Sequence, residues 1–153
     1  MQNLLKKDKI RRYFVIHAGK RGNLQRFFWP SENWAKLVDF LHEKYHLPII
    51  LTGSSLEKEL NEGIIQLVKS AKVYNFCEKT TLAQWAFLIK NAEALICLNT
   101  GASHLASAFR TRAVVINEEF PELWHPWIPE GKYRILLNPK VEEAEREIEA
   151  FLK

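Results

Sequence analysis

The feature that most constrains the fold of this chain is an alternation that runs along the whole sequence. Short apolar runs rich in β-branched residues are each followed by a longer segment in which apolar residues recur at helical spacing. Strands that alternate with helices in this way form a parallel sheet with helices on both faces. The sequence therefore predicts a Rossmann-like α/β domain. We expect its strands at residues 13–16, 48–52, 73–75, 94–98, 113–116 and 134–137.

Helix starts are marked by capping residues. Ser31 is the predicted N-cap of a helix that runs to Tyr45, and Thr81 and Gln84 have the spacing of a capping box before another helix. A further helix is expected after Gly53. One stripe of it would carry Leu56, Leu60, Ile64, Leu67 and Val68. Helices are also expected after residue 104 and over residues 141–152.

Composition narrows the class of protein. A length of 153 residues, with 47% hydrophobic and 26% charged residues, is typical of one globular domain, and no apolar run approaches the roughly 18 to 20 residues of a membrane span. The two cysteines, Cys77 and Cys97, lack metal-ligand spacing, and the first residues do not resemble a secretory signal. We therefore expect a cytoplasmic protein. The net charge of +4 comes from dispersed basic residues, so nucleic acid is not an expected partner.

A candidate anion site follows the predicted strand at residues 94–98. The apolar run ends at residue 98 and is followed by Asn99, Thr100 and Gly101. His104 lies within the first turn of the helix that is predicted next. Unpaired N–H groups and a positive dipole end at a helix start bind phosphate without a dedicated cation. Thr100 or Asn99 can cap the helix, and Gly101 permits close approach. The alternative is an ordinary capped turn between a strand and a helix.

Other unusual residues also follow predicted strands. In an open parallel sheet the ligand lies beyond the carboxyl ends of the strands, so these loops are candidates for one binding site. Cations, hydroxyls and a carboxylate around one rim suit a nucleotide that carries a sugar. The candidates outside the 99–104 segment are Lys20, Arg21, Arg26, Glu57, Lys79 and Thr80.

Each candidate also has a purely structural interpretation. Lys20, Arg21 and Arg26 can be solvated loop charges, and Glu57 can be a favourable acid in the first turn of a helix. Trp29 and Trp34 are expected to be core residues rather than platforms for a ligand.

Two common nucleotide signatures are missing. The sequence contains neither a Gly-x-x-x-x-Gly-Lys-Ser/Thr loop nor a Gly-x-Gly-x-x-Gly turn, which argues against an ordinary nucleoside triphosphatase or a dehydrogenase. A metal site built from His17, His104 and His125 is a further alternative, although their spacing matches no known ligand pattern.

Together these motifs resemble glycosyltransferase family 9, the heptosyltransferases, in their carboxyl-terminal, donor-binding half. Residues 99–106, Asn-Thr-Gly-Ala-Ser-His-Leu-Ala, are similar to the family's Asp-Thr-Gly-x-x-His-Leu-x. Supporting matches are His-Ala-Gly at 17–19, Trp-Pro-x-x-x-Trp at 29–34, Leu-Thr-Gly at 51–53 with Glu57 after it, and Lys-Thr-Thr-Leu at 79–82. The similarity covers about residues 13–152.

The resemblance implies half of a glycosyltransferase B enzyme that transfers a sugar from ADP-heptose to a lipopolysaccharide core acceptor, without a metal ion or other cofactor. Residues 13–153 would bind the nucleotide-sugar donor, and residues 1–12 resemble the family's interdomain linker. The family's general base lies on an amino-terminal, acceptor-binding half that this sequence lacks, so that half would be a partner. A peripheral position at the inner membrane face is an alternative to free cytoplasmic location. The implied donor-binding residues are Lys20, Arg26, Glu57, Lys79, Thr80, Asn99, Thr100, Gly101 and His104.

Several positions depart from the family's pattern. Asn99 replaces the motif's aspartate, Phe27 replaces a lysine, Glu78 replaces a glycine, and the acids Glu118 and Glu119 stand in a shortened loop. A like charge near a phosphate is unfavourable. These changes predict an altered donor preference or a weakened site. The alternative function is therefore a degenerate, non-catalytic module for binding or assembly.

Overall fold

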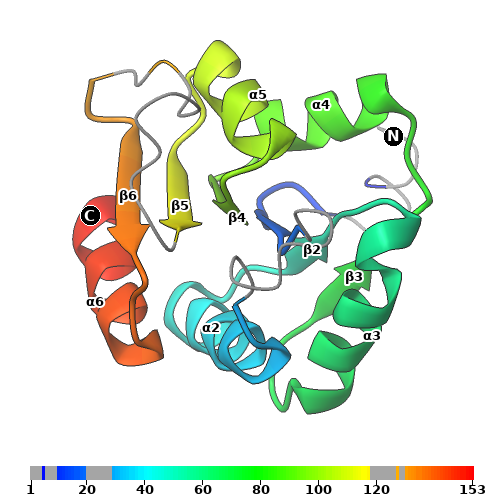
Figure 1. Ribbon diagram of the computed structural model, residues 1–153, viewed down its shortest axis with the longest axis horizontal. Coiled ribbons are helices and arrows are strands. Elements are labelled where there is room, and N and C mark those ends of the chain that lie inside the picture. The colour runs from blue at the N-terminus through cyan, green and yellow to red at the C-terminus, as the bar shows by residue number, and fades with distance from the viewer. Residues whose placement is uncertain (1–4, 6–9, 20–28, 118–126, 128–129) are drawn as a thin grey trace.

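The computed structural model describes residue 5 and residues 10–19, 29–117, 127 and 130–153. Within them the chain forms a six-stranded sheet in the order β3-β2-β1-β4-β5-β6, with every neighbouring pair parallel (Figure 1). The strands are β1 (Phe14–His17), β2 (Ile49–Leu51), β3 (Val73–Asn75), β4 (Ala94–Leu98), β5 (Ala113–Asn117) and β6 (Tyr133–Leu137). The helices are α2 (Ser31–Tyr45), η2 (Ser55–Glu57, a 3₁₀ turn), α3 (Lys58–Leu67), α4 (Leu82–Lys90), α5 (Gly101–Phe109) and α6 (Val141–Leu152).

Helices cover both faces of the sheet, as the sequence predicts. Figure 1 shows α2, α3 and α6 on one side and α4 and α5 on the other. The strand residues alternate between two apolar clusters: Phe14 and Ile16 face the α2 side, whereas Val15 faces the α4 and α5 side. The inner strands β2 and β4 are buried on both faces and are apolar at every position, which explains their continuous apolar runs.

Two aromatic side chains anchor the α2 side. Trp29 and Trp34 are buried, and their rings meet edge to face with centroids 4.9 Å apart. The Trp29 indole N–H donates to the carbonyl of Pro139 at 3.2 Å. The prediction that both are core residues is confirmed.

Some boundaries differ from the sequence prediction. Ser31 is the first helical residue of α2 rather than its cap: Pro30 holds the N-cap position, with no side-chain cap. The segment after Gly53 begins with η2, and the α-helix starts only at Lys58. The predicted stripe is therefore wrong at both ends, because Leu56 precedes the α-helix and Leu67 is 42% exposed. Leu56 is 66% exposed, while Leu60 and Ile64 are buried.

The amino-terminal residues are only partly described. Leu5 and Ile10 are both buried against the α4 and α5 side, and Ile10 N–H donates to the Leu5 carbonyl at 2.8 Å. The other residues expected to form a linker, up to position 9, lie outside the described part of the chain. No helix among the described residues combines the length and hydropathy needed to cross a membrane.

The strand order determines where a ligand can approach. From β1 the chain moves outward to β2 and β3, then returns to the other side of β1 for β4, β5 and β6. The connections after β1 and β4 therefore diverge, and they leave a crevice at the carboxyl ends of these two strands.

Candidate functional site

The turn between β4 and α5 has the geometry expected of a helix start that can bind an anion. The Thr100 hydroxyl caps α5 by accepting from the Ala102 N–H at 3.4 Å. The Ser103 hydroxyl donates to the Thr100 carbonyl at 2.7 Å and lies 3.3 Å from Asn99 Oδ1. Of the two predicted caps, Thr100 is therefore the one used, and Asn99 supports the turn through Ser103.

The turn after β1 lies directly against this helix start. A Cβ atom placed on Gly19 would be 2.8 Å from Thr100 Cγ2 and 3.2 Å from His17 Cδ2. Only a residue without a side chain fits there, so Gly19 is required by close approach. The two turns that flank the crevice are thus in contact.

A buried polar network continues from β1 to β2 and α4. His17 Nδ1 lies 3.2 Å from Thr52 Oγ1, and the Trp85 indole N–H donates to the same hydroxyl at 3.2 Å. The His17 and Trp85 ring centroids are 5.1 Å apart. Thr52 is fully buried, so this hydroxyl fixes both rings at the carboxyl end of the sheet.

His17 and Trp85 form one wall of a cavity of about 550 Å³, which we call the rim cavity. It lies at the carboxyl ends of β1, β2 and β3, and its other walls come from η2 and the start of α4. The rim cavity is lined by His17, Gly53, Ser54, Ser55, Glu57, Glu78, Thr80, Thr81, Leu82 and Trp85. Gly101 lies beside it, because a Cβ on Gly101 would be 3.8 Å from Trp85 Cη2.

Glu57 has a structural role in this wall. Its Oε2 accepts from both the N–H and the hydroxyl of Ser54 at 2.7 Å, and Ser54 in turn accepts from the Leu56 N–H. This is a capping box for η2, so the helix-start interpretation of Glu57 is confirmed. The carboxylate is 5% exposed and still lines the rim cavity, so the structural role does not remove it from the site.

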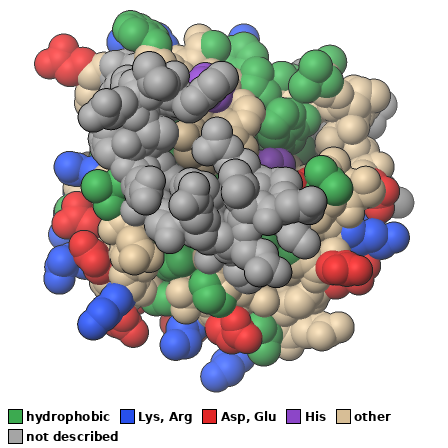
Figure 2. Space-filling model, in the orientation of Figure 1, with side chains coloured by type: hydrophobic (Ala, Val, Ile, Leu, Met, Phe, Trp, Pro, Cys, Tyr) green, Lys and Arg blue, Asp and Glu red, His purple; other side chains and the backbone are tan. Residues whose placement is uncertain are grey.

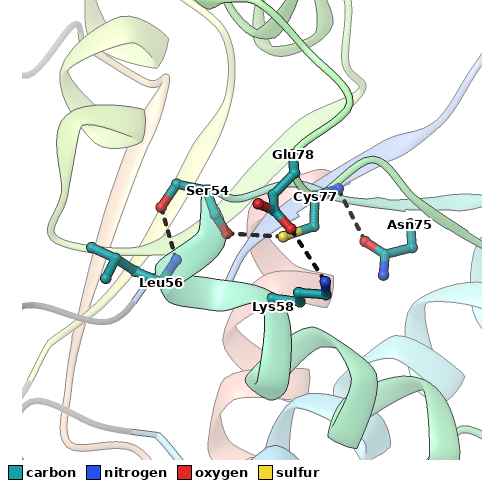
Figure 3. Close-up of polar contacts among 6 residues, drawn as sticks. All are labelled: Ser54, Leu56, Lys58, Asn75, Cys77 and Glu78. Atoms are coloured by element: carbon teal, nitrogen blue, oxygen red, sulfur yellow. Dashed lines mark hydrogen bonds and ion pairs between the residues drawn. The ribbon is translucent and has the colours of Figure 1, made fainter.

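The turn after β3 closes the other side of the rim cavity (Figure 3). The Cys77 thiol donates to the Ser54 carbonyl at 3.0 Å, and the Cys77 N–H donates to Asn75 Oδ1 at 3.0 Å. Glu78 forms an ion pair with Lys58 at 3.6 Å. Its φ of 59° lies in the left-handed region that favours glycine, which is the residue that the resemblance places here.

The predicted site residues are therefore partly assembled. Glu57 and Thr80 line the rim cavity, and the turn of Asn99 and Thr100 adjoins it through Gly19. Lys79 does not line it: its ammonium donates to the Asn75 carbonyl at 2.9 Å.

Another predicted residue, His104, does not line the rim cavity. His104 is exposed on the first turn of α5. Lys20, Arg26, Phe27, Glu118 and Glu119 lie outside the described residues.

Sequence reasoning missed part of the lining. His17 was considered as a metal ligand and as part of the His-Ala-Gly match but not as a donor-binding residue, and Trp85 only as an apolar helix residue. Nothing in the sequence indicates that Thr52 joins these two rings, because the three residues come from three separate elements. His125 lies outside the described residues, and among those described no group of three His, Cys, Asp or Glu side chains could hold a metal ion.

Burial changes the acid–base behaviour of His17. Burial lowers the pKa of its imidazole, and the nearby Glu57 carboxylate and a hydrogen bond with the Thr52 backbone offset this only in part. The ring is therefore neutral at neutral pH.

Figure 2 shows histidine side chains beside hydrophobic ones in the upper half of the face that it draws, whereas Lys, Arg, Asp and Glu gather around the edge of that face.

Comparison with solved structures identifies the fold. The chain superposes on E. coli ADP-heptose lps heptosyltransferase II with a TM-score of 0.85 and 18% identity, covering 99% of this chain and 50% of that one. A glycosyltransferase family 9 protein from Veillonella parvula gives a TM-score of 0.85 at 13% identity, with 99% and 49% covered. E. coli heptosyltransferase WaaC, solved with ADP, gives 0.71 at 20% identity, with 99% and 47% covered.

These similarities show the α/β fold of one half of a glycosyltransferase B enzyme. The chain spans about half the length of the solved proteins that it matches. A search of curated protein sequences found no match. The profile of "Glycosyltransferase family 9 (heptosyltransferase)" matches residues 2–150. Because this match covers nearly the whole sequence, the chain belongs to glycosyltransferase family 9.

Proposed function

We propose that this chain is the donor-binding domain of a heptosyltransferase-like enzyme. It binds the ADP portion of an ADP-sugar, with ADP-heptose as the expected donor and a lipopolysaccharide core as the expected acceptor. In the family, the acceptor site and the general base lie on an amino-terminal domain. Transfer would therefore require that domain together with this one.

One observation carries the proposal: the capped start of α5 adjoins a cavity at the point where the strand order reverses. Thr100 and Gly19 are in contact range, Gly19 lies beside the His17 ring, and His17 lines the rim cavity together with Glu57 and Thr80. A diphosphate at the α5 start would meet main-chain N–H groups, and the nucleoside would extend into the rim cavity. Donors aimed at the leaving diphosphate would also stabilise charge that develops during transfer.

The assignment of Glu57, Thr80 and the turn at 99–101 follows from this placement, whereas that of Lys79, Lys20 and Arg26 follows from the family resemblance alone. Asn99, Thr100, Gly101 and His104 would surround the diphosphate and the neighbouring sugar. Glu57 would accept from a ribose hydroxyl, because it lines the rim cavity. We place Lys79 and Thr80 beside the adenosine, and Lys20 and Arg26 near the diphosphate.

Calorimetric titration with ADP tests the proposal directly. We expect measurable binding heat at millimolar ligand or below, and no heat would contradict a donor site. Thr100→Val keeps the shape of the side chain but removes the hydroxyl that would meet the diphosphate, so it should weaken binding by about fivefold, which corresponds to about 1 kcal/mol. The matched control is Thr100→Ser, which retains the hydroxyl and should bind ADP like the wild type.

A second titration separates a working site from the degenerate binding module. Two carboxylates, Glu57 and Glu78, line the rim cavity, and this observation favours a weakened site. If the site is weakened, Asn99→Asp together with Phe27→Lys should tighten ADP binding. If neither the wild type nor this double variant binds ADP, a non-catalytic binding or assembly role is the better assignment.

A further inference from the structure

The charges that line the rim cavity do not suit an anion while His17 is neutral. Among the described lining residues there are two carboxylates, Glu57 and Glu78, and no Lys or Arg. His17 is the only imidazole in this lining. Of the described lining residues, His17 is therefore the one whose side chain can become a cation for an anionic ligand, and it does so only by gaining a proton.

His17 is placed to face the start of α5. It is the last residue of β1, between β2 and β4, and its side chain is 8% exposed. One ring nitrogen, Nδ1, is near Thr52, while Nε2 lies 3.3 Å from the position of a Cβ on Gly19. That same position is 2.8 Å from Thr100. The Nε2 edge therefore points to the place where the two crevice turns meet.

The groups around His17 include few charges. Glu57 approaches from η2 and attracts the protonated ring, and Glu78 lines the same cavity from the turn after β3, where it pairs with Lys58. The other neighbours among the described residues are Thr52 of the β2 turn, Trp85 of α4 and Cys97 of β4, and all three are uncharged. Burial raises the pKa of the Cys97 thiol, so it stays protonated. On α5 the nearest titratable group is His104, which is exposed.

We propose that His17 takes up one proton from the solvent when a nucleoside diphosphate binds, and that the resulting imidazolium faces the diphosphate. The inference rests on the proposed function and adds a residue and a proton to it. In the empty site burial outweighs the attraction of Glu57, so the ring is neutral. A diphosphate at the α5 start brings further negative charge beside the Nε2 edge. The bound state therefore favours the charged ring, and binding is linked to pH.

Calorimetry in two buffers of different ionisation enthalpy measures this proton. ADP is titrated at the same pH in each buffer, and the difference in apparent heat gives the number of protons exchanged. We expect an uptake of up to about one proton per ADP, with affinity that falls by about tenfold per pH unit between the pKa values of the free and bound states. ADP itself can exchange protons, so the result is read as the difference between variants.

His17→Asn should abolish the uptake and weaken ADP binding at neutral pH. The control is His46→Asn, which removes an exposed imidazole at the carboxyl end of α2, near the amino end of β2, and should leave the uptake unchanged. Uptake that persists in His17→Asn, or disappears in His104→Asn alone, would overturn the proposal.

Nuclear magnetic resonance of the wild type keeps the test valid if His17→Asn fails to fold. The His17 imidazole signals should change from the neutral to the charged form on saturation with ADP at neutral pH. ADP binding without this change refutes the role of His17 and leaves the proposed function intact. Failure of ADP to bind at all refutes both.

Discussion

The contact between Gly19 and Thr100 predicts the effect of one methyl group. In Gly19→Ala the new Cβ would lie 2.8 Å from Thr100 Cγ2 and 3.2 to 3.3 Å from two atoms of the His17 ring. Overpacking of this kind costs about 1 to 3 kcal/mol, and loss of glycine's freedom in the unfolded chain returns about 0.4 to 1 kcal/mol. We therefore expect Gly19→Ala to lower the free energy of unfolding by about 1 to 2 kcal/mol.

A second substitution shows whether this cost comes from the contact itself. Thr100→Ser removes Cγ2 but keeps the hydroxyl that caps α5, so alone it should cost less than about 0.5 kcal/mol. In the double variant the shortest contact is gone, and the remaining ones to His17 are milder. The double variant should recover about 1 kcal/mol relative to Gly19→Ala, which is a coupling typical of residues in contact.

Urea unfolding, monitored by tryptophan fluorescence, gives the free energy of unfolding of the wild type, the two single variants and the double variant. Equal slopes of free energy against urea would show that the unfolded state is unchanged. The matched control is Gly131→Ala: a Cβ at Gly131 would meet no atom within 4 Å, but its φ of 66° makes any cost purely one of backbone conformation. Thr100→Ser should give no rescue there. Strict additivity between Gly19→Ala and Thr100→Ser would refute the contact and the convergence of the two turns.

Three further predictions concern stability. Asp39 accepts from the N–H groups of Lys69, Ser70 and Ala71, so Asp39→Ala should cost about 2 to 3 kcal/mol in urea unfolding; no change would contradict these bonds. Burial raises the pKa of Asp39, but the hydrogen bonds from these N–H groups lower it by more, so the pKa lies below its ordinary value. The stabilisation is therefore complete above the pKa of Asp39 in the unfolded chain and is lost as the pH falls through its pKa in the folded protein. The free energies of unfolding of wild type and Asp39→Asn should converge at low pH. Glu78→Gly should raise the free energy of unfolding by about 0.5 to 1 kcal/mol by relieving the left-handed backbone, and Glu78→Ala, which cannot, should not.

The order of strands and helices could be predicted from the sequence because it depends on local periodicity. Strands β3 and β4 and helix α6 have the predicted bounds, since continuous apolar runs and a stripe of buried residues at helical spacing are properties of neighbouring residues. The capping box of Thr81 and Gln84 is also confirmed, because it joins residues three apart. The prediction of Ser31 as N-cap was wrong because Pro30 occupies that position and Ser31 is already the first helical residue.

The same distinction between local sequence properties and tertiary contacts applies to the candidate site. The sequence alone determined which residues follow each strand and that Thr100 can cap a helix, because both are local properties. Only the tertiary structure decided that Gly19 touches Thr100, that Thr52 joins His17 to Trp85, and that Lys79 bonds to a carbonyl outside the rim cavity lining. These contacts join residues from different strands and helices. Their distances follow from how the parallel strands are ordered in the sheet, and no local pattern of residues encodes them.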